Sequence, residues 1–394
     1  MNPSASGWIQ KFGHLAERKQ PPFDDFGQVC GALHSLGFTY GMNTRIPDFI
    51  RPAHPLTQDE NAKLNLVYGL YYTYRVQHPN SGFEAFLESV LTFYRGMEVG
   101  HLNFLQKILS GNKTSDQLEK LIDSRVYLEA SVLSKAFNNL LTNSLLFVDV
   151  LTYRHFLQGE AEPRTYAREL EYIVINITYQ ALGSKRTHPT DERLRDLFRA
   201  SLTYLDEPQA RADSGYRQRL QAYRGTDAAC YFLDVASLTV WEDNNLEYQE
   251  SRFVFDLGEE LGLEEGVIRR ALLDVTAFFE AYSGHLSVLR EQNSLDSMTR
   301  LVHKLIRRNS KRLQKELAQS RDLVYLLSKS TVRDLSEEER SRVREQLVDI
   351  FKSIPSLAIF MLPGGAVLLP IFIKLIPRLL PSSFDENRVD PEAE

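Results

Sequence analysis

Cysteine is scarce in this sequence: its 394 residues include only Cys30 and Cys230, which lie far apart. A small extracellular domain held by disulfides needs more cysteines, so we expect a reducing compartment. The N-terminal residues 1–27 also lack the basic start and the apolar stretch of a secretory signal. We therefore expect most of the chain to lie in the cytosol.

The common catalytic motifs are also missing. The sequence has no Gly-x-x-x-x-Gly-Lys-Ser/Thr phosphate loop, no Gly-x-Ser-x-Gly elbow, no His-Glu-x-x-His pair and no Cys-x-x-Cys pair. Its nine histidines are scattered, and no two are spaced to reach one metal ion from a helix. We therefore expect no enzymatic activity and no cofactor.

Positive charge is not in excess, because 46 Lys and Arg stand against 52 Asp and Glu, giving a net charge of −6. Proteins that bind DNA usually carry a net positive charge, so we expect no DNA partner. A local basic patch remains compatible with this composition.

Strand patterns bounded by Asn-Gly or Asp-Gly turns are absent, and helical spacing of apolar residues recurs instead. Polar breaks that contain Gly or Pro separate the helical segments. The sequence therefore predicts an all-α, multi-helical protein. The clearest helical segments are residues 61–76, 83–97, 128–157 and 165–182.

The breaks and shifts in composition predict five regions along the chain. Two helical regions, 1–160 and 161–290, precede a charged helical segment at 291–352. An apolar segment follows at 353–384, and residues 385–394 form an acidic tail that we expect to be disordered.

Asp149 is a carboxylate inside the apolar helical run NSLLFVDVL. It could be a buried functional acid, but an acid at the wet edge of the helix, or one hydrogen-bonded to a neighbour, is the simpler interpretation. The sequence leaves these alternatives open.

The acidic stretch WEDNNLEYQE precedes a new helix, and Asn244 and Glu247 have the spacing of a capping box. Asp243, Asn245 and Glu250 could also supply oxygen ligands to a hard cation, although only fragments of an EF-hand loop are present. We favour capping and keep a metal site as the weaker alternative.

Residues 225–290 resemble the TerB-like helical domain of tellurite-resistance proteins. Asp243, Asn244, Leu246 and Glu250 match its acidic turn, and ELGL (260–263) matches the end of its next helix. The resemblance implies a helical hairpin whose turn is suspected of binding metal in that family.

The stretch RLVHKLIRRNSKRLQKELAQSR (300–321) contains eight Lys or Arg and one Glu, and its apolar residues fall on one helical face. Such a helix can lie on an anionic bilayer, contact ribosomal RNA, or simply expose a solvated basic face. The residues that would contact lipid or RNA are Arg300, Lys304, Arg307, Arg308, Lys311, Arg312 and Lys315.

No charged residue occurs from Ser353 to Ile373. As a helix, this run would reach roughly 31 Å, just enough to cross a bilayer core. Prolines kink a helix and leave carbonyls without donors, so a re-entrant hairpin that breaks at the two glycines is the alternative. The residues that mark the expected membrane segment are Pro355, Pro363, Gly364, Gly365, Pro370, Lys374, Pro377 and Pro381.

Residues 354–384 resemble the membrane segment of the leucine-zipper, EF-hand-containing transmembrane (LETM) family. The five prolines, Lys374 and the closing Leu-Pro-Ser-Ser-Phe fall in the register of that family, and residues 335–352 resemble its lead-in helix. The whole chain is similar to bacterial LETM-related proteins described as biofilm-associated. The resemblance implies either cation/proton exchange or ribosome binding.

Two departures from the family bear on these functions. The acid suspected in cation exchange is replaced by Gly365 and Ala366. The family's ribosome-binding-like domain would begin after Phe384, where this chain has ten further residues. We therefore predict a non-enzymatic scaffold or interaction protein anchored to the cytoplasmic membrane, with lipid and other copies of the chain as partners. Exchange of K⁺ or Ca²⁺ for protons, and ribosome binding, are the alternatives.

Overall fold

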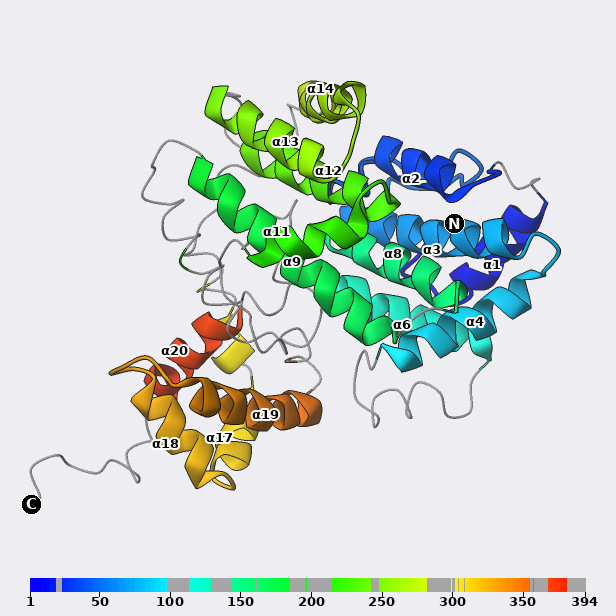
Figure 1. The fold of residues 1–394 in the computed structure, drawn as a ribbon. Helices are drawn as coiled ribbons and strands as arrows, with labels where there is room; N and C mark the ends of the chain where they lie inside the picture. Colours follow the sequence, from blue (N-terminus) through cyan, green and yellow to red (C-terminus); the bar gives the residue numbers. More distant parts are fainter. Residues whose placement is uncertain are drawn as a thin grey trace, which may run out of the picture.

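The computed structural model describes most of the chain. The described residues are 1–18, 23–97, 113–128, 144–159, 162–184, 196, 215–241, 248–281, 299, 302–303, 305–307, 309–354, 357 and 368–380. Every regular element among these residues is helical, and none of them lies in a strand. The all-α prediction is therefore confirmed (Figure 1).

The first half of the chain forms two short helices followed by longer ones. The described helices are α1 (Trp8–Glu17), α2 (Phe26–Ser35), α3 (Gln58–Gln77), α4 (Phe83–Gly96), α6 (Thr114–Leu128) and α8 (Leu146–Leu157). The sequence predicted α3 and α4 to within a few residues. Of the long helix expected over 128–157, the structure describes α8 at one end, and residues 129–143 lie outside the described part.

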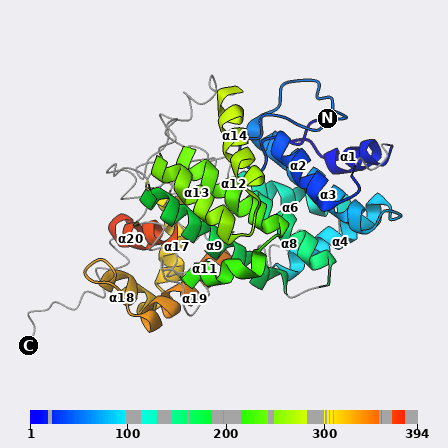
Figure 2. The same cartoon turned by 45° about the horizontal axis from the view of Figure 1, so that its top comes forward.

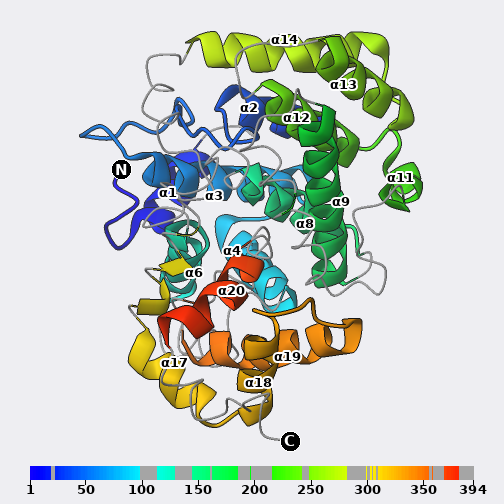
Figure 3. The same cartoon turned by 90° about the vertical axis from the view of Figure 1, so that its left-hand side faces the viewer.

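The middle of the chain continues the same helical packing. Its elements are α9 (Pro163–Ser184), α11 (Gly215–Leu220), the 3-10 turn η2 (Gln221–Tyr223), α12 (Asp227–Trp241), α13 (Tyr248–Glu260) and α14 (Glu265–Ala281). The helix α9 packs on both α8 and α12. The last helix, α14, lies across α12 and α13 at one edge of the molecule (Figures 2 and 3). We call α1 to α14 the helical body.

The centre of the helical body is α3, which contacts α2, α4, α6 and α8. All residues from Ala62 to Tyr74 are buried, so the helix has no solvent-facing side along this length. A capping box begins the helix, because the backbone N–H of Glu60 donates to Thr57 Oγ1 and that of Thr57 donates to Glu60 Oε2. A helix buried on all sides is expected at the core of a large bundle.

Asp149 belongs to a buried ion-pair network between α4, α6 and α8. Its side chain is fully buried, Arg125 Nε donates to Asp149 Oδ2 at 2.9 Å, and Arg125 Nη2 pairs with Oδ1. The hydroxyl of Tyr94 donates to the same Oδ2 at 2.9 Å. Asp149 therefore does not lie at a solvent-facing edge of its helix. The other interpretation, an acid hydrogen-bonded to a neighbour, is correct. Burial, followed by the Asp149 charge, raises the pKa of Tyr94 well above its usual value.

The helices α13 and α14 approach each other closely at Gly258. A Cβ atom at this position would lie 2.5 Å from the Ile268 side chain, so only glycine fits without movement. At the end of α13, Gly262 has φ +70°, the left-handed conformation that commonly follows a helix. The hairpin of α13 and α14 therefore depends on two glycines for different reasons.

Four further helices form a separate group, which we call the C-terminal region. They are α17 (Ser310–Leu317), α18 (Arg321–Lys329), α19 (Glu337–Ser353) and α20 (Leu369–Leu379). The helix α18 contacts each of the other three. Figures 1 and 3 show these helices together at one end of the molecule, drawn in yellow to red.

Candidate functional site in the C-terminal region

The interior of the C-terminal region is almost entirely apolar. The buried side chains of α18 and α19 meet those of α20, and the rings of Phe351 and Phe372 pack edge to face at 5.2 Å. Side chains with 2% exposure or less in this core are Leu313, Leu317, Leu323, Val324, Leu327, Val343, Leu347, Phe351, Ile354, Leu368, Phe372, Ile373 and Ile376. Burial of these groups supplies the main stabilisation of the region.

A network around Glu339 fixes the turn from α18 to α19. Ser336 and Glu339 form a capping box, in which the N–H of Ser336 donates to Glu339 Oε2 at 2.9 Å. Lys329 Nζ and Arg333 Nη2 both donate to Glu339 Oε1, at 2.6 and 2.9 Å. The bond from Lys329, followed by that from Arg333, lowers the pKa of Glu339 to about 2. Lys329 and Arg333 therefore stabilise the fold by binding Glu339.

The cations of α17 are arranged differently. Lys311, Arg312 and Lys315 are exposed, as is Arg307 in the residues just before the helix, whereas Leu313 and Leu317 are fully buried. Within the described part of the chain, none of these four cations forms an ion pair with a carboxylate. Of the amphipathic helix predicted over 300–321, α17 forms residues 310–317 with the expected apolar and basic faces, and Arg300, Lys304 and Arg308 lie outside the described residues.

A helix face with unpaired cations is suited to bind a polyanion. Its ammonium and guanidinium groups can contact phosphates without breaking an existing ion pair, and the counterions that they release from the polyanion favour binding. Since the whole chain carries a net charge of −6, this face is a local exception.

The apolar run predicted to lie in a membrane is described only in part. Pro370 and Pro377 both belong to α20, Pro370 in its first turn and Pro377 in its interior, and Lys374 is exposed on the same helix. Pro355, Pro363, Gly364, Gly365 and Pro381 lie outside the described residues.

The described part of α20 has eleven residues, which corresponds to about 16 Å of helix. Among the described residues, no helix is both long and apolar enough to cross a membrane.

The acidic turn expected to cap a helix or bind a cation cannot be placed. Asp243, Asn244 and Asn245 lie outside the described residues, and Glu250 falls within the first turn of α13. Among the described residues, no three His, Cys, Asp or Glu side chains are grouped so that they could hold a metal ion.

Sequence reasoning did not predict the Glu339 network. The signal was present, because Ser336 and Glu339 have the spacing of a capping box and two cations precede them within ten residues. It did not predict the partner of Asp149 either, because Arg125 lies in a helix with four other charged residues and nothing in the sequence distinguishes it from a surface cation.

Comparison with known protein families gives one match. Residues 335–393 match the model described as LETM1-like, RBD, a ribosome-binding domain. The match includes α19, α20 and the apolar run, and it therefore begins well before Phe384. No curated protein and no solved structure matches the chain. Over residues 335–393 the chain is therefore similar to the LETM1-like, RBD family, and we call this part the LETM1-like region.

Proposed function

We propose that this chain is a non-enzymatic ribosome-binding protein that makes its contact through the C-terminal region. The observation that carries the proposal is the match of residues 335–393 to the LETM1-like ribosome-binding domain. The exposed cations of α17 support it, because they lie in the same group of helices and carry no ion pairs within the described part of the chain.

The charge distribution favours one orientation on the ribosome. Ribosomal RNA presents a dense array of phosphates, which attracts Lys311, Arg312 and Lys315 and repels the acidic remainder of the chain. We therefore expect the C-terminal region to face the RNA and the helical body to point away from it.

Co-sedimentation of the full chain with purified ribosomes tests this proposal. The triple variant Lys311→Gln, Arg312→Gln, Lys315→Gln should bind at least about tenfold more weakly, and the slope of log K against log salt should fall by about 2. A matched control replaces Arg252, Arg269 and Arg270 by Gln, which removes the same charge from exposed positions on α13 and α14. Equal losses in both triple variants, or no binding of the wild type at low salt, would overturn the proposal.

We propose membrane attachment as a second function, supported by a different observation. The run from Ser353 to Ile373 has no charge, and it directly precedes Lys374, whose long side chain suits a membrane interface. The chain would then sit at the cytoplasmic membrane with most of its residues in the cytosol.

Alkaline carbonate extraction of cell membranes tests this second proposal. An integral segment should keep the chain in the pellet, and the variant Phe360→Lys, within the uncharged run, should release it. Release of the wild type by carbonate would exclude an integral attachment.

A further inference from the structure

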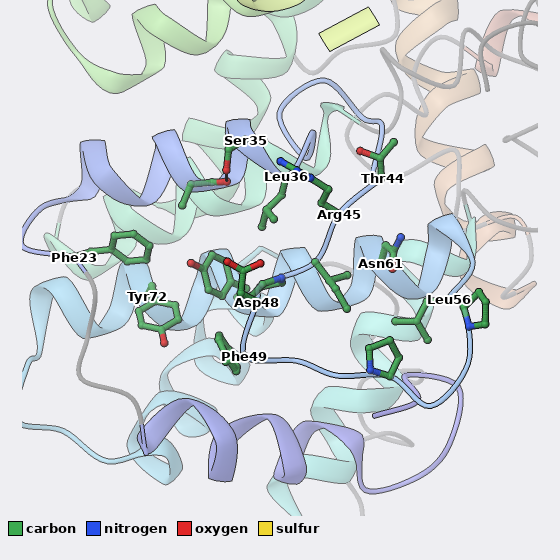
Figure 4. Close-up of a pocket in the computed structure, with 16 residues that line it drawn as sticks. Phe23, Ser35, Leu36, Thr44, Arg45, Asp48, Phe49, Leu56, Asn61 and Tyr72 are labelled. Carbon is green, nitrogen blue, oxygen red and sulfur yellow. Dashed lines mark hydrogen bonds between the residues drawn. The ribbon is translucent and has the colours of Figure 1, made fainter. Parts of the chain in front are cut away.

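A large cavity lies in the helical body, far along the chain from the LETM1-like region. It has a volume of about 910 Å³ and is bounded by the end of α2, by α3 and by the loop from Thr44 to Leu56 (Figure 4). Small-molecule sites usually have volumes of about 300–1,000 Å³, so this cavity is at the upper end of that range. Neither the sequence patterns nor the family match assigns it a role.

Four aromatic rings form one wall, which we call the aromatic floor: Phe23, Phe49, Tyr68 and Tyr72. The rings of Tyr68 and Tyr72 meet edge to face with centroids 4.8 Å apart, and Phe23 contacts Tyr72 at 5.2 Å in the same way. Phe49 lies 6.2 Å from Tyr68 with its ring inclined by 37°. The rings therefore support one another, and Phe23 and Phe49 are the two that are only partly buried, whereas Tyr68 and Tyr72 lie almost fully beneath the surface.

The charge next to this floor is a carboxylate. Asp48 is exposed and forms no ion pair or hydrogen bond within the described part of the chain. It lies near Tyr68: burial and then the Asp48 charge raise the pKa of the Tyr68 phenol to about 12. Figure 4 shows the side chain of Arg45 extending instead toward Leu36 and Ser35 at the end of α2. A cationic group of a ligand next to the aromatic floor would therefore lie near the Asp48 carboxylate and away from the Arg45 guanidinium.

The loop that carries Asp48 is held in place by two asparagines of α3. Asn61 Nδ2 donates to the carbonyl of Asn43 at 2.7 Å, and Asn65 Nδ2 donates to the carbonyl of Arg45 at 2.9 Å. The hydroxyl of Thr44, which lines the cavity, is buried and has no hydrogen-bond partner within the described part of the chain. The site is therefore largely preformed and retains one unused polar group.

We propose that this cavity binds a ligand that carries a protonated amine or a guanidinium group beside an apolar part. The cation would lie against the aromatic floor and next to Asp48, which combines a cation–π contact with an ion pair. The apolar part would cover the remaining surface of Phe23 and Phe49.

The same arrangement disfavours other ligands. An anion next to the aromatic rings would face the Asp48 carboxylate, a repulsive contact, because Arg45, which also lines the cavity, extends toward the end of α2. A purely apolar ligand would cover part of Asp48 without supplying it a counter-ion. The cation could come from a free polyamine or from a Lys or Arg side chain on an extended peptide, because both present the same chemistry.

Isothermal titration of the full chain tests the proposal and distinguishes the two sources. The probes are spermidine, the peptide acetyl-Pro-Pro-Lys-Pro-Pro-amide, and the same peptide with Glu in place of Lys. The proline rings suit an aromatic floor, and the Glu peptide reverses only the charge. We expect at least one cationic probe to bind, and the Glu peptide to bind at least about tenfold more weakly than the Lys peptide.

Variants of the cavity then locate the binding site. Asp48→Asn keeps the shape and removes the charge, and should weaken binding about tenfold; Phe49→Ala should weaken it by a similar factor. The control Asp334→Asn removes an exposed carboxylate in the C-terminal region and should have no effect. Binding of spermidine alone, or of the Lys peptide alone, supports the proposal and identifies the source. Absence of binding by both cations at millimolar concentration, or unchanged affinity in Asp48→Asn, would overturn it.

Discussion

The helical body and the C-terminal region use charge in different ways. In the body, Arg125 and Asp149 are 3% and 0% exposed and hydrogen-bond to each other within an aromatic-rich core. In the C-terminal region, the core is apolar and the cations stay at the surface, where some bind Glu339 and others have no acidic partner within the described residues. A charged side chain in the body is therefore often structural, whereas one on α17 is available for a partner.

Removing Asp149 tests the structural side of this comparison and should have the largest effect. Asp149→Ala leaves the Arg125 guanidinium buried without its counter-ion, so we expect a loss of about 3–5 kcal/mol in the free energy of unfolding. Urea unfolding of the full chain measures this loss. The double variant Arg125→Met, Asp149→Leu removes both charges and should recover much of it; a double variant as unstable as the single one would show that the charges are not the cause.

A variant in the apolar core of the C-terminal region tests the other side of this comparison. Phe372→Ala removes a fully buried ring that packs on Phe351, so we expect a loss of about 3 kcal/mol. Because α18 to α20 pack mainly on one another, the loss should be local. Amide hydrogen exchange should accelerate in these helices and stay unchanged in α3. The control Val332→Ala alters a side chain that is 88% exposed and should have no effect; equal acceleration in α3 would mean that the two regions unfold together.

A smaller effect is expected from the half-buried His34 in α2. Its Nε2 lies 2.5 Å from the Tyr40 hydroxyl and 3.6 Å from Asp234 Oδ1. Burial alone would lower the pKa of His34, but the hydrogen bond to Asp234 and the charges of Asp234 and Asp274 outweigh it and raise the pKa above 6.5. Protonated His34 therefore stabilises the fold below about pH 6.5, and this contribution is lost as the pH rises through the raised pKa.

The measurement is the free energy of unfolding from pH 5 to 9 for the wild type and for His34→Gln. The difference between them should be largest at the acidic end and should shrink as the pH rises. A difference that grows with pH would mean that neutral His34 is the stabilising form.

We expect the smallest effect on stability from Glu339, because its ion pairs lie at the surface. A carboxyl with a pKa lowered to about 2 contributes stability above its unfolded value of about 4.5, and this contribution disappears as the pH falls through about 2. Hydrogen exchange in α19 should therefore be faster in Glu339→Gln than in the wild type at pH 7 and equal in both near pH 2. Equal exchange at pH 7 would show that Lys329 and Arg333 do not hold the turn.

The sequence predicted those features that depend on local spacing. The helical class and the basic face of α17 follow from the positions of apolar residues along one helix, which is why Lys311 and Lys315 are exposed. The partner of Asp149 could not be predicted, since Arg125 lies 24 residues away on another helix and is brought to it by tertiary packing. The cavity was missed for a similar reason, because the path of its loop depends on hydrogen bonds from Asn61 and Asn65.

The two prolines of α20 affect how its backbone can be solvated. Pro377 has no N–H, so the carbonyl of Ile373 does not receive the hydrogen bond that it would normally accept within a helix. This carbonyl needs a donor from water, from a side chain or from a neighbouring chain. Bare hydrocarbon offers none, and α20 is therefore chemically suited to places where protein or water covers this side of the helix.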